Sequence, residues 1–173
     1  MKLSRKRGQA QYGAGIKSLQ QKCTTCQGNL IYDDVADVTW FDYTYEGPCP
    51  EAYVGATLAE ANTWVEGLTV GGVTGWIRPL FASNCNILTC ATYDCPECKV
   101  KSDNNTIGYL YWGTFGGSTQ RGMLPFSKIY NGSGKSYWTS QVNPTAFSFY
   151  DGKLAQAERA YAMCIRKSVS SLI

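Results

Sequence analysis

The chain has 173 residues, of which 44% are hydrophobic, 13% aromatic and only 17% charged. This length suits one domain with a core of its own, and so many aromatic residues with so few charges exclude a disordered chain. The sequence contains no histidine, which excludes Ser-His-Asp and Cys-His catalysis and histidine-bound metals. A phosphate-binding glycine loop of the G-x-x-x-x-G-K kind does not occur either.

The net charge of +3 is unevenly distributed along the chain. Residues 1–22 carry six lysines and arginines and no acid, so ten of the 16 bases and all 13 acids are left for the rest, which is mildly acidic. We therefore expect a basic N-terminal arm over 1–28, ordered only against a partner, and a recognition domain over 29–173. The arm residues expected to dock into a larger protein assembly are Lys2, Arg5, Lys6, Arg7 and Lys17.

Other roles stay open for this arm, namely binding of nucleic acid, binding of an anionic membrane, or none beyond that of a solvated tail. Behind the charged start there is no run of about 7 to 15 apolar residues, so we expect no secretory signal in the sequence as given. No stretch approaches the roughly 18 continuous apolar residues of a membrane span.

The first elements of the expected domain are two strands and a helix. Apolar residues among Asp and Thr over 29–41 predict two short strands around an Asp-rich turn. Residues 57–68 predict the clearest helix, because Thr57 and Glu60 form a capping box and the apolar positions fall on one face. Gly67 and the glycines soon after it predict where this helix ends.

Strands dominate the expected C-terminal third. Aromatic and polar residues alternate there, which predicts half-buried strands over 109–112, 136–140 and 146–150. Asp151-Gly152 predicts a two-residue hairpin turn, and Asn131-Gly132 a second turn. The expected fold class is thus α+β, strand-rich with one clear helix. Three tryptophans are expected in its core: Trp40, Trp76 and Trp138.

Eight cysteines form an even set, and four of them lie in an insertion over 83–101 that has little periodicity. An even set at this density favours disulfides and an exterior location, so we expect a disulfide-stapled domain without cofactor or metal. The C-x-x-C pairs at 23–26 and 95–98 leave a zinc site open, and the spacing at 90–98 leaves iron-sulfur ligation open. The disulfide candidates are Cys23, Cys26, Cys49, Cys85, Cys90, Cys95, Cys98 and Cys164.

Two further groups of side chains suggest binding. Asp33, Asp34 and Asp37 could bind calcium, but three Asp residues in a loop between strands are more typical of turn formers. Exposed aromatic residues are the usual platform for sugars and protein partners, and the chain has 12 tyrosines and five tryptophans. The expected ligand contacts lie in the C-terminal third: Tyr111, Trp112, Phe115, Arg121, Asn131 and Lys135.

A series of motifs carries a family resemblance. They are VTWFDY (38–43), LAEANTWVEGL (58–68), GVTGW (72–76), YLYWGTF (109–115), LPF (124–126), SYWTS (136–140), AFSFYDGKL (146–154) and AMCIR (162–166). Their order and spacing over about 29–168 resemble the C-terminal domain of bacterial collagen-like adhesins of the Lcl type, and related formylglycine-generating-enzyme-like domains. The resemblance implies a C-type-lectin-like fold and adhesion.

The sequence departs from this family at several positions. Where the family usually reads Trp-Arg-Leu-Pro-Thr, this chain reads Trp76-Ile77-Arg78-Pro79-Leu80, so the arginine and the proline are displaced. The calcium-binding signatures of true lectins, Glu-Pro-Asn and Trp-Asn-Asp, are missing from the sequence. The family's helix often carries a cysteine that this chain lacks, which leaves the partner of Cys164 undetermined.

These expectations combine into a non-enzymatic surface recognition or decoration protein that binds glycan or protein. An extracellular or virion location is expected, as for a phage head decoration or tail-fibre protein held in a capsid or tail, or in another oligomer, by its arm. A cell-surface or pilus adhesin is the near alternative. The rival classes are a formylglycine-generating-like enzyme, with Cys85 and Cys90 as its nearest thiols, and a zinc-stapled nucleic-acid module.

Overall fold

The protein is described by a computed structural model with two small antiparallel sheets and few helices, which confirms the α+β class. One sheet has the order β1 (Ile16–Leu19), β2 (Asn29–Asp33), β3 (Val38–Tyr45) and β7 (Ala162–Lys167); the other has the order β4 (Ser136–Trp138), β5 (Thr145–Ser148) and β6 (Leu154–Gln156). The helices are α1 (Leu58–Gly67), α3 (Thr106–Tyr109) and the π-helical turn η2 (Leu110–Thr114). The described residues are 16–19, for the backbone alone, 29–33, 35–48, 55–81, 106–117, 125–140 and 145–167.

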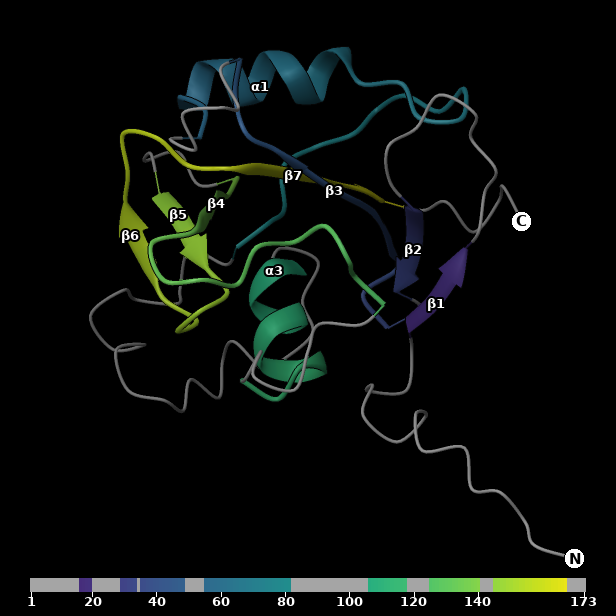
Figure 1. Ribbon diagram of the computed structural model, residues 1–173. Helices are drawn as coiled ribbons and strands as arrows, with labels where there is room; N and C mark the ends of the chain where they lie inside the picture. The colour runs from purple at the N-terminus through teal and green to yellow at the C-terminus, as the bar shows by residue number, and fades with distance from the viewer. Residues whose placement is uncertain are drawn as a thin grey trace, which may run out of the picture.

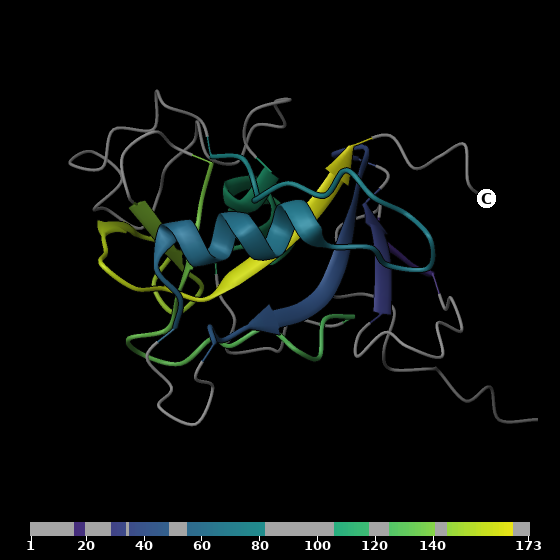
Figure 2. The ribbon, with the colours of Figure 1, turned by 90° about the horizontal axis from the view of Figure 1, so that it is seen from above.

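The four-stranded sheet lies between helices on its two faces (Figures 1 and 2). Strand β7 shows this directly, because its side chains alternate between the faces. Met163 and Ile165 join the cluster formed with α3 and η2, whereas Ala162 and Cys164 belong to clusters that include residues of α1. The tryptophans expected in the core are buried there, with Trp40 and Trp138 fully enclosed and Trp76 nearly so.

Helix α1 confirms the prediction made from its capping box. Thr57 is the N-cap residue, its hydroxyl accepts a hydrogen bond from the Glu60 backbone N–H, and the Glu60 carboxylate accepts one from the Thr57 backbone N–H at 2.7 Å. Ala61 and Val65 are its buried positions, one turn apart on the face toward the sheet.

The fold begins inside the predicted arm. Residues Ile16–Leu19 form β1, antiparallel to β2 with Ile16 opposite Asp33, so the arm as predicted over 1–28 includes an edge strand. This strand covers backbone groups of β2 that would otherwise be left at the sheet edge. Lys17 lies in β1, and the other arm candidates, Lys2, Arg5, Lys6 and Arg7, lie outside the described residues.

The strand predicted over 109–112 is wrong, because this segment is helical. Ile107, Leu110, Tyr111 and Thr114 are all buried, and their spacing of three, one and three residues is that of one helix face. The backbone N–H of Phe115 donates to the Leu110 carbonyl at 3.0 Å, which is a π-type bond. Thr106, Gly108 and Trp112 are buried as well, so this short helix has almost no polar face to distinguish it from a buried strand.

The other predictions for the last third hold in outline. Strands β4 and β5 lie where strands were predicted, and β5 and β6 form a hairpin at Asp151-Gly152. Its turn spans four residues rather than two, since the Ser148 N–H donates to the Lys153 carbonyl at 2.9 Å. The turn predicted at Asn131-Gly132 lies two residues later, at Ser133-Gly134, where the Lys135 N–H donates to the Gly132 carbonyl at 3.1 Å.

Candidate functional site

A groove of about 850 Å³ opens beside the C-terminal end of β3. One wall is residues 43–47, where β3 runs beyond Asn29, the residue of β2 that pairs with Asp42. The other wall is the segment 127–130. We call this the tyrosine groove, and its lining residues are Tyr43, Thr44, Tyr45, Glu46, Gly47, Ser127, Lys128 and Tyr130.

A buried carboxylate holds the second wall against β3. Asp42 is fully buried, and it accepts hydrogen bonds from the backbone N–H and the hydroxyl of Ser127, both at 2.9 Å, and from the Lys128 N–H at 3.0 Å. Three donors on one carboxylate satisfy a charge that would be costly to bury alone. Asp42 therefore fixes where the segment 127–130 starts.

Two hydroxyl groups extend this attachment along the groove. The Thr44 hydroxyl donates to the Lys128 carbonyl and lies 2.8 Å from the Tyr137 hydroxyl, which in turn accepts from the Tyr130 N–H at 2.6 Å. Burial raises the pKa of Tyr137, so it stays a neutral phenol that donates to Thr44. The groove wall is thus tied to the core at Ser127, Lys128 and Tyr130.

The groove surface combines aromatic rings with charged and hydroxyl groups. The ring of Tyr45 stacks on Trp64 of α1 with centroids 5.0 Å apart and an interplanar angle of 3°, which fixes it in place. Across the groove, the Tyr130 side chain is 36% exposed, and its hydroxyl donates to the Glu46 carboxylate. Lys128 is exposed and makes no ion pair with a described residue. Such a surface offers ring area together with hydrogen-bond donors and acceptors.

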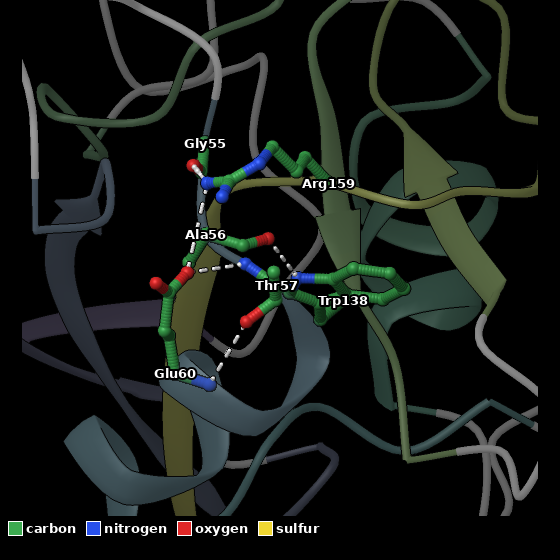
Figure 3. Close-up of polar contacts among 6 residues, drawn as sticks. All are labelled: Gly55, Ala56, Thr57, Glu60, Trp138 and Arg159. Atoms are coloured by element: carbon green, nitrogen blue, oxygen red, sulfur yellow. Dashed lines mark hydrogen bonds and ion pairs between the residues drawn. The ribbon is translucent and has the colours of Figure 1, made fainter.

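At the end of the groove lining, the chain turns at Gly47, a position that only glycine fits. Gly47 has a φ of 93°, and a Cβ there would lie 2.8 Å from the Gly55 carbonyl oxygen. Figure 3 shows how the far side of this turn is held: Arg159 donates to the Gly55 carbonyl at 3.0 Å and the Trp138 indole to the Ala56 carbonyl at 2.9 Å. Ala56 directly precedes Thr57, the N-cap residue of α1.

Two of the predicted ligand-contact residues are buried in the core. Tyr111 and Trp112 are 2% and 5% exposed, because η2 turns both rings into the main core. Phe115 is half-buried and packs edge-on against Phe126, with ring centroids 6.0 Å apart. Arg121 lies outside the described residues.

Two predicted contacts lie near the groove. Asn131 is exposed directly after Tyr130. The Lys135 ammonium donates to the Tyr161 hydroxyl and lies 4.9 Å from that ring's centroid and 6.0 Å from that of Tyr130. Lys135 therefore packs against the Tyr130 ring. Neither Asn131 nor Lys135 belongs to the groove lining.

The prediction from sequence missed the tyrosine groove itself. Tyr43 and Tyr45 stand two residues apart at the end of a strand, so they share one face. That face is half-buried at both positions, whereas Asp42 and Thr44, which point to the other face of the strand, are buried. A pattern of buried polar and half-exposed aromatic residues is the signal that could have located this site.

The described acidic residues of the 33–37 turn are turn formers. Asp33 is buried, and its carboxylate accepts from the Val35 N–H at 3.1 Å and the Ala36 N–H at 2.9 Å. Asp37 has a φ of 51° and accepts from the Tyr32 hydroxyl at 2.9 Å. Asp34 lies outside the described residues, and those that are described contain no cluster suited to a metal ion.

Cys164 is the one disulfide candidate that the described residues include, and there it is a free, fully buried thiol. It packs among Leu30, Phe41, Val65 and Trp76, and burial raises its pKa. A protonated thiol in apolar surroundings is unreactive. The other seven cysteines lie outside the described residues, so their pairing stays a prediction.

No family model, curated protein sequence or solved structure matches the chain. Among the described residues, no helix has both the length and the apolar character needed to cross a membrane.

Proposed function

We propose that this chain is a non-catalytic recognition domain that binds glycan in the tyrosine groove. The observation that carries the proposal is the groove itself, in which Tyr45 and Tyr130 face a space of about 850 Å³ beside Glu46 and Lys128. Sugars present apolar ring faces and many hydroxyls, so they suit a surface of aromatic rings with both donors and acceptors. The walls are tied to the core by Asp42, Thr44 and Tyr137, which limits the ordering cost of binding.

The proposal includes a C-type-lectin-like fold and a location on a virion or cell surface. A C-type-lectin-like fold is supported by the order of the sequence motifs, and a place on a phage virion, held by the basic arm, is supported by six bases without an acid over residues 1–22. A cell-surface adhesin would use the same groove. Neither location changes the ligand that the groove would take.

The test is a glycan array with one variant in the groove and one outside it. Tyr130→Ala removes an exposed ring from the groove, and Tyr150→Ala removes one that is 60% exposed and not part of the groove lining. We expect Tyr130→Ala to lower the affinity for the bound glycan by about tenfold or more, since aromatic rings that contact a ligand contribute much of the binding energy. Tyr150→Ala should keep the affinity of the wild type.

Circular dichroism and thermal melting of both variants check that the fold is kept. Equal binding by the two variants would contradict the groove as the glycan site. Binding that fails on every glycan but is found with a protein from the host surface would replace glycan by protein as the ligand class.

A further inference from the structure

A second, smaller pocket of about 280 Å³ lies between α1 and the segment 76–80. It coincides with the place where the sequence departs from the family resemblance, at Trp76-Ile77-Arg78-Pro79-Leu80. The pocket shares no residue with the tyrosine groove. We call it the Arg78 pocket, and its lining residues are Asn62, Val65, Glu66, Trp76, Ile77, Arg78, Leu80 and Ser140.

The backbone around Arg78 is fixed on both sides. Ile77 exchanges two hydrogen bonds with Ile165 of β7, each 2.8 Å long, and the Ser140 N–H donates to the Pro79 carbonyl at 2.9 Å. The guanidinium itself donates to the Thr139 carbonyl. Arg78 is therefore held in one place before any ligand arrives, which lowers the entropic cost of binding to it.

The charge of Arg78 is half-buried and has no counter-ion in the part of the chain that the structure describes. No ion pair joins it to a described residue, and its bond to Thr139 uses one of the five N–H donors of a guanidinium. Burial lowers the pKa of Arg78, which is the expected effect of desolvating a cation without a partner. A carboxylate that accepts hydrogen bonds from two of the remaining N–H donors would offset the cost of desolvating this charge.

The opposite wall narrows the choice of ligand. Asn62 and Glu66 stand four residues apart on one face of α1 and line the same pocket. Glu66 would repel a bare carboxylate, but it would accept hydrogen bonds from a ligand that also carries hydroxyl groups. Asn62 and Ser140 can bind hydroxyls as well. The pocket volume is at the lower limit for a ligand site, which suits one sugar ring.

We infer that the Arg78 pocket binds the acidic sugar of a glycan, with Arg78 holding its carboxylate and Glu66 accepting from its hydroxyls. This inference rests on the proposed glycan-binding function and names the sugar class that a second subsite would select. Arg78 would serve as a specificity residue, because a neutral sugar gains nothing from its charge.

The test compares methyl β-D-glucuronide with methyl β-D-glucoside, which differ in the carboxylate at C6 alone. NMR titration of the isotope-labelled protein should show the glucuronide binding about tenfold more tightly, with shifts at Asn62, Ile77 and Ser140. Arg78→Lys keeps the charge but loses two-point contact, so it should remove most of that preference. Equal affinity for the two sugars, or a full preference in Arg78→Lys, would overturn the inference.

A second variant keeps the test valid if Arg78→Lys fails to fold. Glu66 is exposed and forms no ion pair with any residue that the structure describes, so Glu66→Gln should fold normally. Because it removes a repelling charge and keeps an acceptor, it should tighten glucuronide binding a few-fold and leave the glucoside unchanged; no change for either sugar would count against the pocket. Free glycine, added as a competing ligand, tests the alternative. If it displaces the glucuronide, the pocket is a site for zwitterions instead.

Tyr130→Ala separates this inference from the proposed function. Loss of array binding in that variant, with no sugar preference at Arg78, would leave the tyrosine groove as the glycan site and remove the pocket. The opposite result is array binding that Tyr130→Ala leaves unchanged, together with a glucuronide preference that still depends on Arg78. That result would keep the Arg78 pocket and remove the tyrosine groove as the glycan site.

Discussion

At the scale of single residues, glycine positions decide whether the core can close. Gly152 in the β5–β6 turn has a φ of 69°, and a Cβ there would lie 2.3 Å from the Tyr111 ring and 2.7 Å from the Trp112 ring. Both rings are buried and cannot move aside. The hairpin turn can therefore pack against η2 only because Gly152 has no side chain.

Three glycine-to-alanine variants separate the causes of this requirement. Gly67 has ordinary φ and open space, Gly72 has a φ of 81° and open space, and Gly152 has both positive φ and a clash. We expect no loss of unfolding free energy for Gly67→Ala, a loss of about 1 kcal/mol for Gly72→Ala and a loss of about 2 to 4 kcal/mol for Gly152→Ala. Urea denaturation measures all three, and similar losses for Gly72→Ala and Gly152→Ala would show that the rings make room.

Residue identity predicted the core far better than it predicted the site. Large aromatic residues such as Trp40 and Trp138 are buried because so much apolar area is costly to expose, and no partner need be known to say so. Which tyrosines stay at a surface depends on distant segments. Tyr130 lines the groove because Asp42, more than 80 residues earlier, fixes its segment, and nothing local encodes that contact.

At the scale of elements, α1 was predictable because its signals are local. The capping box spans four residues and the buried face repeats each turn, so both are read without knowledge of the tertiary fold. The segment 106–114 was not, since its helix buries nearly every side chain and periodicity then loses its contrast. Short buried helices and short buried strands look alike in sequence for this reason.

The cap of α1 gives a pH dependence whose sign is determined. Hydrogen bonds from Thr57 lower the pKa of Glu60 from its ordinary value of 4.5, with a smaller contribution from Arg159 at 3.6 Å. Since the folded protein holds the ionised form more strongly, this stabilisation is complete above the ordinary value. It is lost as the pH falls through the lower folded value.

Glu60→Gln should therefore be less stable than the wild type near pH 7 and should lose less stability between about pH 5 and pH 3. Thermal melting across this range measures the difference. Glu158→Gln changes an exposed acid outside the cap and serves as the control. Thr57→Ala should lower the unfolding free energy by about 0.5 to 2 kcal/mol, and parallel acid curves for Glu60→Gln and the wild type would contradict this account of the cap.

At the scale of the whole molecule, the free Cys164 changes the arithmetic of the cysteines. With eight cysteines and one buried as a thiol, seven remain, so at most three disulfides can form within one chain. We expect an oxidised mass about six daltons below the reduced mass, rather than the roughly eight of a fully paired set.

Alkylation distinguishes the two thiols that such a count leaves. Cys164 should react with iodoacetamide only after denaturation, because the native core excludes the reagent and keeps the thiol protonated. The other unpaired cysteine should react in the native state or join two chains. Peptide mapping identifies both, and native labelling of Cys164 would contradict its burial.

The pairing of β3 with β7 joins Phe41 to Cys164 across most of the chain. Strand β7 leaves the ribosome more than a hundred residues after β3. Until then, the edge of β3 that pairs with β7 is unpaired and can pair with another strand. Loop closure over this distance makes folding slow compared with a domain of local contacts. Expression of this protein should for that reason depend on chaperones that shield β3 during synthesis, and its yield should fall as the rate of synthesis rises.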